Sequence, residues 1–263
     1  HKDDLSSANL EGTLEGKKII IQGLGNVGYH AAKFLQEQDG ALIIAILERD
    51  GAIINEDGLD IDEVSKYKSE HGKVEGFPNS KFINNGNQVL EHPCDILIPA
   101  AMEGVITHEN APKIQAKVIA EAANGPVTFE ADQILNKKGI FIIPDAYLNA
   151  GGVTVSYFEW LKNLSHVRFG RMDRRFVEAQ GQKIIEAIES GIGKPLALIA
   201  KEKLLAGPDE VDLVRSGLED TMRVAYSEIK EQQLSNTKIE DRRTAAYALA
   251  IRNIADIYES MYL

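Results

Sequence analysis

The chain has 263 residues, of which 29 are basic and 40 acidic, so its formal net charge at pH 7 is −11. A surface this acidic repels phosphate backbones, which disfavours general binding of nucleic acids. Hydrophobic residues make up 44% and charged residues 26%, which is typical of a globular protein and excludes a disordered or fibrous chain. The length is sufficient for one large domain or two small ones.

The apolar runs and the single cysteine limit the class of protein further. Cys94 has no second cysteine to pair with, which excludes an internal disulfide and any zinc site built from several cysteines. The longest apolar run, residues 41–47, is far shorter than the roughly 20 residues needed to cross a bilayer. The first residues include neither a methionine nor an apolar signal region. We therefore expect a cytoplasmic protein, of which this chain is a piece.

In chain order, residues 1–16 are polar and interrupted by glycine, and we interpret them as a lead-in segment. Short, continuous, β-branched runs then alternate with helix-like segments. Such runs are typical of strands covered on both faces. We expect strands at residues 19–21, 42–47, 96–98, 118–120 and 140–143, and helices at 26–38, 61–69 and 130–137. The alternation predicts an α/β fold, with a doubly wound, Rossmann-type and mostly parallel sheet over residues 17–160.

Residues 161–263 are expected to form a helical C-terminal region. Apolar residues at 211, 214, 218, 222, 225 and 229 share one helix face, and Asp209 is suited to cap that helix. A last helix is expected from Arg242 to about Tyr258. Between residues 170 and 207 the chain is charged and interrupted by glycine and proline, which predicts an insertion with short helices of its own.

A glycine-rich turn, Gly23 to Gly28, directly follows the first expected strand. Gly23 permits the tight turn, Gly25 lets the backbone approach a pyrophosphate, and Gly28 lets helix and strand pack closely. The following helix N-terminus offers unpaired N–H groups to phosphates. The context of strand, turn and helix favours a dinucleotide-binding site over a purely structural turn.

Glu48 ends the second expected strand, 20 residues after Gly28. This is the expected position of an acid that binds the adenine-ribose hydroxyls, although a solvated strand end is the alternative. A carboxylate repels the additional phosphate of NADP, which favours NAD. Arg49 could hold that phosphate, so NADP is not excluded.

Three further loops follow expected strands and contain Ala100, Asn124 and Asn149. In an open parallel sheet, loops at the carboxyl ends of the strands line the ligand crevice. Small residues there let a flat ring lie close, and asparagine amides both donate and accept hydrogen bonds. Ordinary turn chemistry is the alternative interpretation.

Several longer motifs resemble one enzyme family. They are QGLGNVG at 22–28, CDILIPAA at 94–101, AEAANGP at 120–126, PDAYLNAGGVTVSYFEW at 144–160 and RTAAY at 243–247. Together they resemble the C-terminal, coenzyme-binding half of the glutamate dehydrogenases, within the wider glutamate/leucine/phenylalanine/valine dehydrogenase family. The resemblance extends over roughly residues 12–263. Ala122 departs from it, since the family usually has glycine there.

The resemblance implies a role for each matching position. Gly23, Gly25, Asn26, Val27 and Gly28 would hold the pyrophosphate, and Glu48 the adenine ribose. Ala100, Asn124 and Asn149 would line the nicotinamide and its ribose, and Val153 and Ser156 would face the amino acid. Ser156 favours glutamate, because relatives acting on apolar amino acids replace this serine with an apolar residue.

The activity that the resemblance implies is NAD-dependent oxidative deamination of L-glutamate to 2-oxoglutarate and ammonia, by an enzyme that is a homo-hexamer when intact. The family's acid–base lysine and aspartate lie in a substrate domain outside this chain. We therefore assign no catalytic residue and expect the chain alone to be inactive. The alternatives are a non-catalytic dinucleotide sensor and a dehydrogenase of an apolar amino acid.

Other candidate residues favour structural roles. Cys94 opens an apolar strand, which indicates a buried thiol rather than a nucleophile. Glu121 is expected to be solvated or salt-bridged. The histidines show no metal-ligand spacing, so no metal site is expected. The resemblance also raises the question of an antenna in the stretch before residue 242, with a surface helical hairpin as the alternative.

Overall fold

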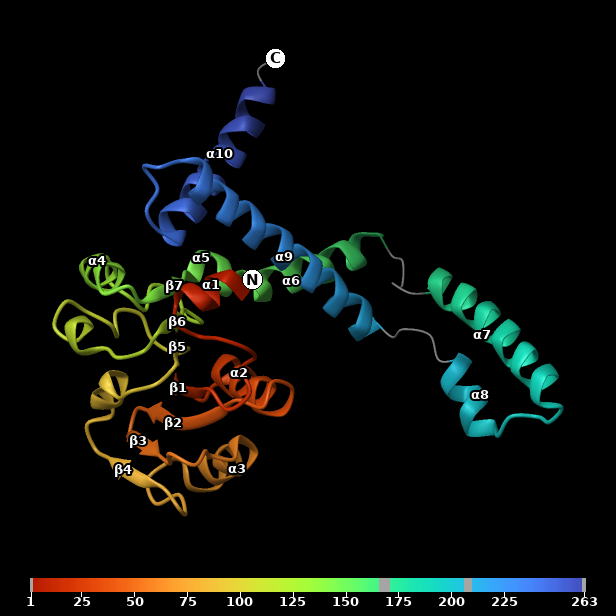
Figure 1. Ribbon diagram of the computed structural model, residues 1–263, viewed down its shortest axis with the longest axis horizontal. Helices are drawn as coiled ribbons and strands as arrows, with labels where there is room; N and C mark the ends of the chain where they lie inside the picture. The colour runs from red at the N-terminus through yellow and green to blue at the C-terminus, as the bar shows by residue number, and fades with distance from the viewer. Residues whose placement is uncertain (1, 166–170, 206–209, 262–263) are drawn as a thin grey trace. The chain divides into compact units, whose positions relative to one another are not determined.

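The computed structural model describes residues 2–165, 171–205 and 210–261 (Figure 1). The chain divides into two compact units. One consists of the chain up to Ala150 and from Glu228 onwards, and the other of Gly151–Ser227. Two helices, α6 (Ala150–Ser165) and α9 (Glu210–Ser235), run through the boundaries between these units. Asp209, the expected cap of α9, lies outside the described residues.

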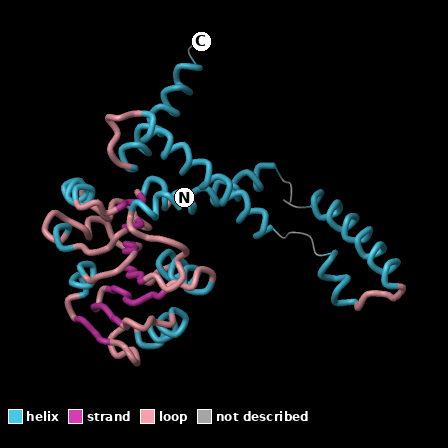
Figure 2. The backbone as a smooth tube through the Cα atoms, viewed as in Figure 1, coloured by secondary structure: helices cyan, strands magenta, loops and turns pink. Residues whose placement is uncertain are grey.

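The first unit contains a seven-stranded sheet in the order β4-β3-β2-β1-β5-β6-β7, with the strands labelled in Figure 1 and coloured magenta in Figure 2. The strands are β1 (Lys18–Gln22), β2 (Leu42–Glu48), β3 (Gly51–Ile54), β4 (Lys81–Ile83), β5 (Ile96–Pro99), β6 (Val118–Ala120) and β7 (Phe141–Ile143). β1 pairs in parallel with both β2 and β5, and β6 and β7 extend the parallel part. The predicted α/β fold with a mostly parallel sheet is confirmed.

Apolar layers cover both faces of the sheet, because its central strands alternate buried side chains between two cores. Ile20 and Leu97 belong to the core that includes Leu135 of α4 (Phe129–Lys137). Ile19 and Ile21 belong to the opposite core, with Ala32 of α2 (Asn26–Glu37) and residues of α3 (Ile61–His71). Burial on both faces explains why these strands are continuous apolar runs in the sequence.

Two strands were not expected from the sequence. β3 pairs antiparallel with β2, and β4 antiparallel with β3. The chain reverses at residues 49–50, directly before Gly51, whose φ of +142° suits glycine. A methyl group there would also lie 2.5 Å from the ring of Phe82. The expected lead-in segment likewise contains a helix, α1 (Lys2–Ser7), and the side chains of Ala8 and Leu10 are buried after it.

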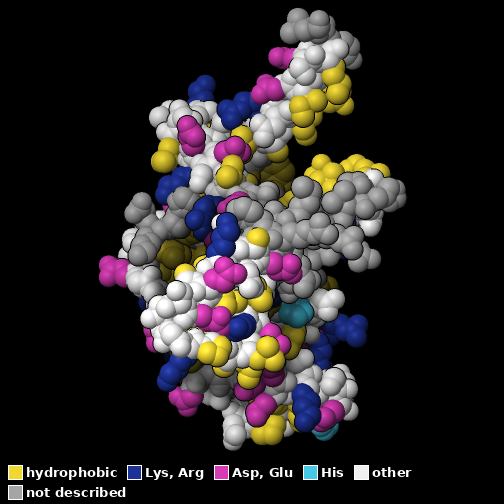
Figure 3. Space-filling model, turned by 90° about the vertical axis from the view of Figure 1, so that its right-hand side faces the viewer, with side chains coloured by type: hydrophobic (Ala, Val, Ile, Leu, Met, Phe, Trp, Pro, Cys, Tyr) yellow, Lys and Arg dark blue, Asp and Glu magenta, His cyan; other side chains and the backbone are white. Residues whose placement is uncertain are grey.

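The first unit also contains three short helical segments and the long helix α10. These are α5 (Asp145–Leu148), which follows β7, one 3₁₀ turn at Gly86–Glu91, another at Ala111–Lys113, and α10 (Arg242–Met261). Ala245 and Ala246 of α10 are buried in a cluster that Tyr147 of α5 packs against. The far end of α10 carries exposed apolar side chains, visible in Figure 3.

The second unit is helical and includes α7 (Arg171–Ile192) and α8 (Leu198–Leu205). The sequence suggested short helices here, but α7 has 22 residues and continues through Gly181 and Gly191. Gly181 serves close packing, since a methyl group on it would lie 2.5 Å from the carbonyl oxygen of Leu204 in α8. In the described part of the chain, no helix combines the length and apolar character required to cross a membrane.

Candidate functional site

A cavity of about 900 Å³ lies at the carboxyl ends of β1, β2 and β5. Gly23, Gly25, Glu48 and Ala100 line it. β1 and β5 are neighbours in the centre of the sheet, and the strand order continues from them in opposite directions. Ligands of open α/β sheets bind at such a switch point. The volume is also that of a pocket for a small molecule or cofactor.

The three glycines of the turn lie in three different environments. Gly23 has φ +92°, and a methyl group on it would lie 2.4 Å from the Cβ of Ala101. A methyl group on Gly28 would lie 1.8 Å from the carbonyl oxygen of Gly23, so helix and turn are in backbone contact here. A methyl group on Gly25 would meet nothing within 4 Å. Gly25 therefore leaves open space at the lip of the cavity, which a ligand can fill.

Helix α2 begins in this open space. Gly25 is its N-cap and provides no side chain to bond the first-turn amides, and the first turn carries no acidic residue. Asn26 and Val27 are exposed on that turn, and Gly28 is buried. Unpaired N–H groups at a helix N-terminus attract anions. The turn is therefore suited to a phosphate group.

Glu48 is held against the turn by two hydrogen bonds to its Oε1 atom. The backbone amide of Leu24 donates to Oε1 at 2.5 Å, and Lys68 Nζ donates at 2.7 Å. The Glu48 side chain is only 14% exposed. Lys68 and the exposed Arg49 line the same cavity. Sequence analysis missed Lys68, since its side chain reaches Glu48 from the last turn of α3 and no local motif marks it.

The two predicted asparagines lie together. Nδ2 of Asn149 donates to Oδ1 of Asn124 at 2.5 Å. This bond leaves the side-chain oxygen Oδ1 of Asn149 available as an acceptor and the side-chain Nδ2 group of Asn124 available as a donor. Neither residue is among those that line the cavity. Ala122 has no positive φ, so the loop accepts alanine in place of glycine.

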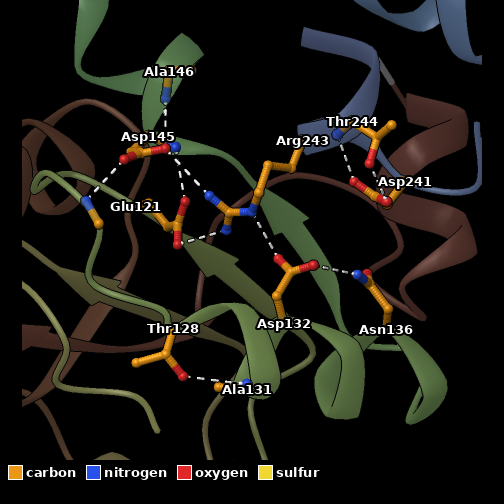
Figure 4. A network of polar contacts seen from close by, with 11 residues as sticks. Glu121, Thr128, Ala131, Asp132, Asn136, Asp145, Ala146, Asp241, Arg243 and Thr244 are labelled. Carbon is orange, nitrogen blue, oxygen red and sulfur yellow. Dashed lines mark hydrogen bonds and ion pairs between the residues drawn. The ribbon is translucent and has the colours of Figure 1, made fainter. Parts of the chain in front are cut away.

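A cluster of ion pairs around Arg243 (Figure 4) is hydrogen-bonded to both of these loops through Asp145. Glu121 is fully buried, and its Oε1 accepts a hydrogen bond from Arg243 Nη2 at 2.8 Å. Arg243 also donates to Asp132 at 2.8 Å and to Asp145 at 3.2 Å. Burial raises the pKa of Glu121 above its ordinary value, against the opposing effect of Arg243. The salt-bridged interpretation of Glu121 is confirmed, whereas the roles of its partners were not foreseen.

The remaining candidates lie elsewhere. Val153 and Ser156 belong to the second unit and are exposed on α6, where Ser156 Oγ donates to the carbonyl oxygen of Gly152 at 3.2 Å. Cys94 is buried, and burial raises the pKa of its thiol to about 12, which agrees with a structural thiol. Within the described ranges, no three histidine, cysteine or acidic side chains are grouped to hold a metal ion.

Comparison with curated proteins identifies similar chains over nearly the whole length. The mitochondrial glutamate dehydrogenase of Dictyostelium discoideum is 51% identical over 260 residues, which is 99% of this chain and 51% of that protein. A probable glutamate dehydrogenase of Sinorhizobium fredii is 46% identical over 256 residues, or 97% of this chain and 58% of that protein. The chain thus spans about half the length of the curated relatives it matches.

Solved structures agree on the fold. A glutamate dehydrogenase from Peptoniphilus asaccharolyticus has a TM-score of 0.62 at 27% identity, over 99% of this chain and 50% of that one. A hetero-hexameric glutamate dehydrogenase from Thermus thermophilus has a TM-score of 0.72 at 22% identity, over 97% and 49%. The model of the glutamate/leucine/phenylalanine/valine dehydrogenase family matches residues 4–192. The chain belongs to the glutamate/leucine/phenylalanine/valine dehydrogenase family.

Proposed function

We propose that this chain is the coenzyme-binding half of an NAD-dependent glutamate dehydrogenase. Dehydrogenases of this type use nicotinamide dinucleotides, and relatives at 51% and 46% identity carry the name glutamate dehydrogenase. The observation that carries the proposal is the open space above Gly25, at an uncapped helix N-terminus beside a fixed carboxylate. A pyrophosphate fits such a site, because it needs close backbone approach and free amides.

In this proposal the turn binds the pyrophosphate through Gly23, Gly25, Asn26, Val27 and Gly28. Ala100 lines the nicotinamide side of the cavity. Asn149 and Asn124 offer an acceptor and a donor to the nicotinamide carboxamide, whose own donor and acceptor complement them. The asparagine pair, bonded at 2.5 Å, thereby fixes the orientation of the ring.

The adenine end of the proposed site favours NAD. Lys68 and Leu24 occupy Oε1 of Glu48, so its other oxygen can accept from the ribose hydroxyls. An additional phosphate on that ribose would meet the carboxylate and be repelled. Lys68 and Arg49 weaken this repulsion, so binding of NADP is reduced rather than abolished.

In the intact enzyme, the proposed reaction removes a hydride and a proton from L-glutamate. A bound nicotinamide ring supplies the acceptor for the hydride, which leaves the α-carbon. Water then hydrolyses the resulting imine to 2-oxoglutarate and ammonia. Val153 and Ser156 would face the amino acid, with the Ser156 hydroxyl donating to the side-chain carboxylate. The acid–base groups are assigned to the other half of a homo-hexameric enzyme.

Calorimetric titration of the chain with NAD and with NADP tests the proposal. We expect binding of both, with NAD tighter. If neither NAD nor NADP binds, the coenzyme function is contradicted. If NADP binds more tightly than NAD, the role of Glu48 is contradicted. With glutamate and NAD the chain alone should form no NADH. Steady NADH formation would show that the acid–base groups lie within it.

A further inference from the structure

Arg243 joins three parts of the first unit that are distant in the sequence. It lies in the first turn of α10 and donates to Asp132 of α4, to Asp145 of α5, and to Glu121 directly after β6 (Figure 4). The proposed coenzyme contacts do not include this residue. Its partner Asp145 is nevertheless hydrogen-bonded to both asparagine loops.

Asp145 connects the guanidinium to both loops. Its Oδ2 accepts from the backbone amide of Gly125 at 2.8 Å, directly after Asn124. Its backbone carbonyl accepts from the amide of Asn149 at 3.1 Å. Glu121 reinforces this connection, because its Oε2 accepts from the amide of Asp145 at 2.8 Å. Each loop is thus one hydrogen bond away from a residue that the guanidinium pairs with.

The position of the guanidinium is itself fixed. Asp241 accepts from the amide of Thr244 at 2.7 Å and from its hydroxyl at 2.8 Å, which caps the helix. Ala245 and Ala246 are buried in the cluster that Tyr147 packs against. α10 is therefore anchored on α5, the helix that leads to the second asparagine.

The cluster depends on the geometry of arginine as well as on its charge. Glu121 is fully buried, and an ionised carboxylate in that environment needs a cation and further hydrogen bonds. A guanidinium presents several donors in one rigid plane, so it can serve three carboxylates at once. A lysine ammonium is a compact charge on a flexible stem and cannot match that geometry.

We propose that Arg243 is a positioning residue that holds Asn124 and Asn149 in the orientation required by the nicotinamide end of the coenzyme, without touching the coenzyme. The inference rests on the proposed coenzyme function. The proposal predicts that a change of Arg243 weakens binding of the nicotinamide end only. The adenine half, held by the glycine turn and Glu48, should bind as tightly as in the wild type.

The test compares NAD with ADP-ribose, which keeps both phosphates and both riboses but lacks nicotinamide. Both are titrated calorimetrically into the wild-type chain and into Arg243→Lys and Arg243→Gln. The matched control is Arg242→Gln, because Arg242 is the neighbouring residue on α10, is buried where Arg243 is half-buried, and pairs with Asp4 at 2.8 Å. All variants are also melted thermally, since each loses a buried ion pair.

We expect the wild-type chain to prefer NAD over ADP-ribose. In both Arg243 variants the ratio of NAD affinity to ADP-ribose affinity should fall about tenfold, the equivalent of one well-aligned hydrogen bond. The affinity for ADP-ribose itself should not change. Arg242→Gln should keep the wild-type preference whatever its melting temperature. An unchanged preference in the Arg243 variants would overturn the proposal, and so would an equal loss in the control.

Two further arms keep the test decisive. If Arg243→Gln fails to fold, the double variant Arg243→Met with Glu121→Gln removes the cation and the buried charge together, and the same loss of preference is expected there. A wild-type chain that binds NAD and ADP-ribose equally would overturn the role of Arg243 but keep the glycine-turn site. A wild-type chain that binds neither would contradict the coenzyme function itself.

Discussion

Alanine substitutions at Gly25 and Gly28 should separate coenzyme binding from stability. In Gly28→Ala the new methyl group and the carbonyl oxygen of Gly23, 1.8 Å apart, would have to separate by more than about 1 Å to reach a normal contact. Backbone atoms cannot rotate away, so the cost is about 3 kcal/mol. The better helix propensity of alanine returns up to about 1 kcal/mol. We expect a net loss of about 2 kcal/mol in the free energy of unfolding.

Gly25→Ala is the matched change with the opposite result. Its φ of −83° suits alanine, and the methyl group meets nothing within 4 Å. The free energy of unfolding should fall by less than about 1 kcal/mol, the difference between the two residues as N-caps. NAD affinity should fall roughly 10- to 100-fold, because the methyl group occupies the pyrophosphate position.

Urea unfolding and calorimetric titration of both variants measure the two quantities. Wild-type NAD affinity in Gly25→Ala would refute the pyrophosphate site at this turn. Wild-type stability in Gly28→Ala would refute the backbone contact between helix and turn. An equal loss in the free energy of unfolding of both variants would refute the open space at Gly25.

Three further outcomes are expected. Glu48→Gln should raise the affinity for NADP relative to NAD by about tenfold, since a repelling charge is removed beside Lys68; calorimetry in which the ratio stays constant would contradict this. Burial raises the pKa of Cys94 from an ordinary 9.0 to about 12. The folded thiol keeps its proton where the unfolded one loses it, so stability should decline from about pH 9 to about pH 12. Urea unfolding of Cys94→Ala should show a flatter decline, and identical slopes would exclude this cause. In the intact enzyme, Ser156→Val should raise the KM for glutamate about 10- to 100-fold through loss of a bond to a charged group. The KM for NAD should not change, and an equal rise in both would argue against substrate contact.

The central strands were predictable because burial on both faces produces a recognisable local pattern of apolar residues in the sequence. β2 is buried on both faces and therefore consists of one continuous apolar run, which gave its start at Leu42 and its end to within one residue. No such local pattern marks β3 and β4. They are short, and β3 begins at a glycine whose role depends on Phe82 in the neighbouring strand. Their pairing is decided by contacts that no local pattern contains.

The same distinction applies to the candidate site. The spacing of the glycine turn indicates a site because all its requirements, from the positive φ of Gly23 to the packing of Gly28, are met within a few residues. Lys68 and Arg243 act through side chains that approach from another helix. The RTAAY motif marks Arg243 as a family residue, but nothing in the motif predicts that Arg243 pairs with three carboxylates.

Glu121 illustrates why a residue's chemistry has to be judged from its partners. A buried carboxylate with a raised pKa beside a candidate ligand loop has the attributes of a general base. Both of its oxygens are engaged, Oε1 by Arg243 and Oε2 by the amide of Asp145. To accept a substrate proton, it would have to break the ion pair and release the loop that carries Asn149. The geometry therefore gives Glu121 a structural role, which agrees with our proposal that the acid–base groups lie outside this chain.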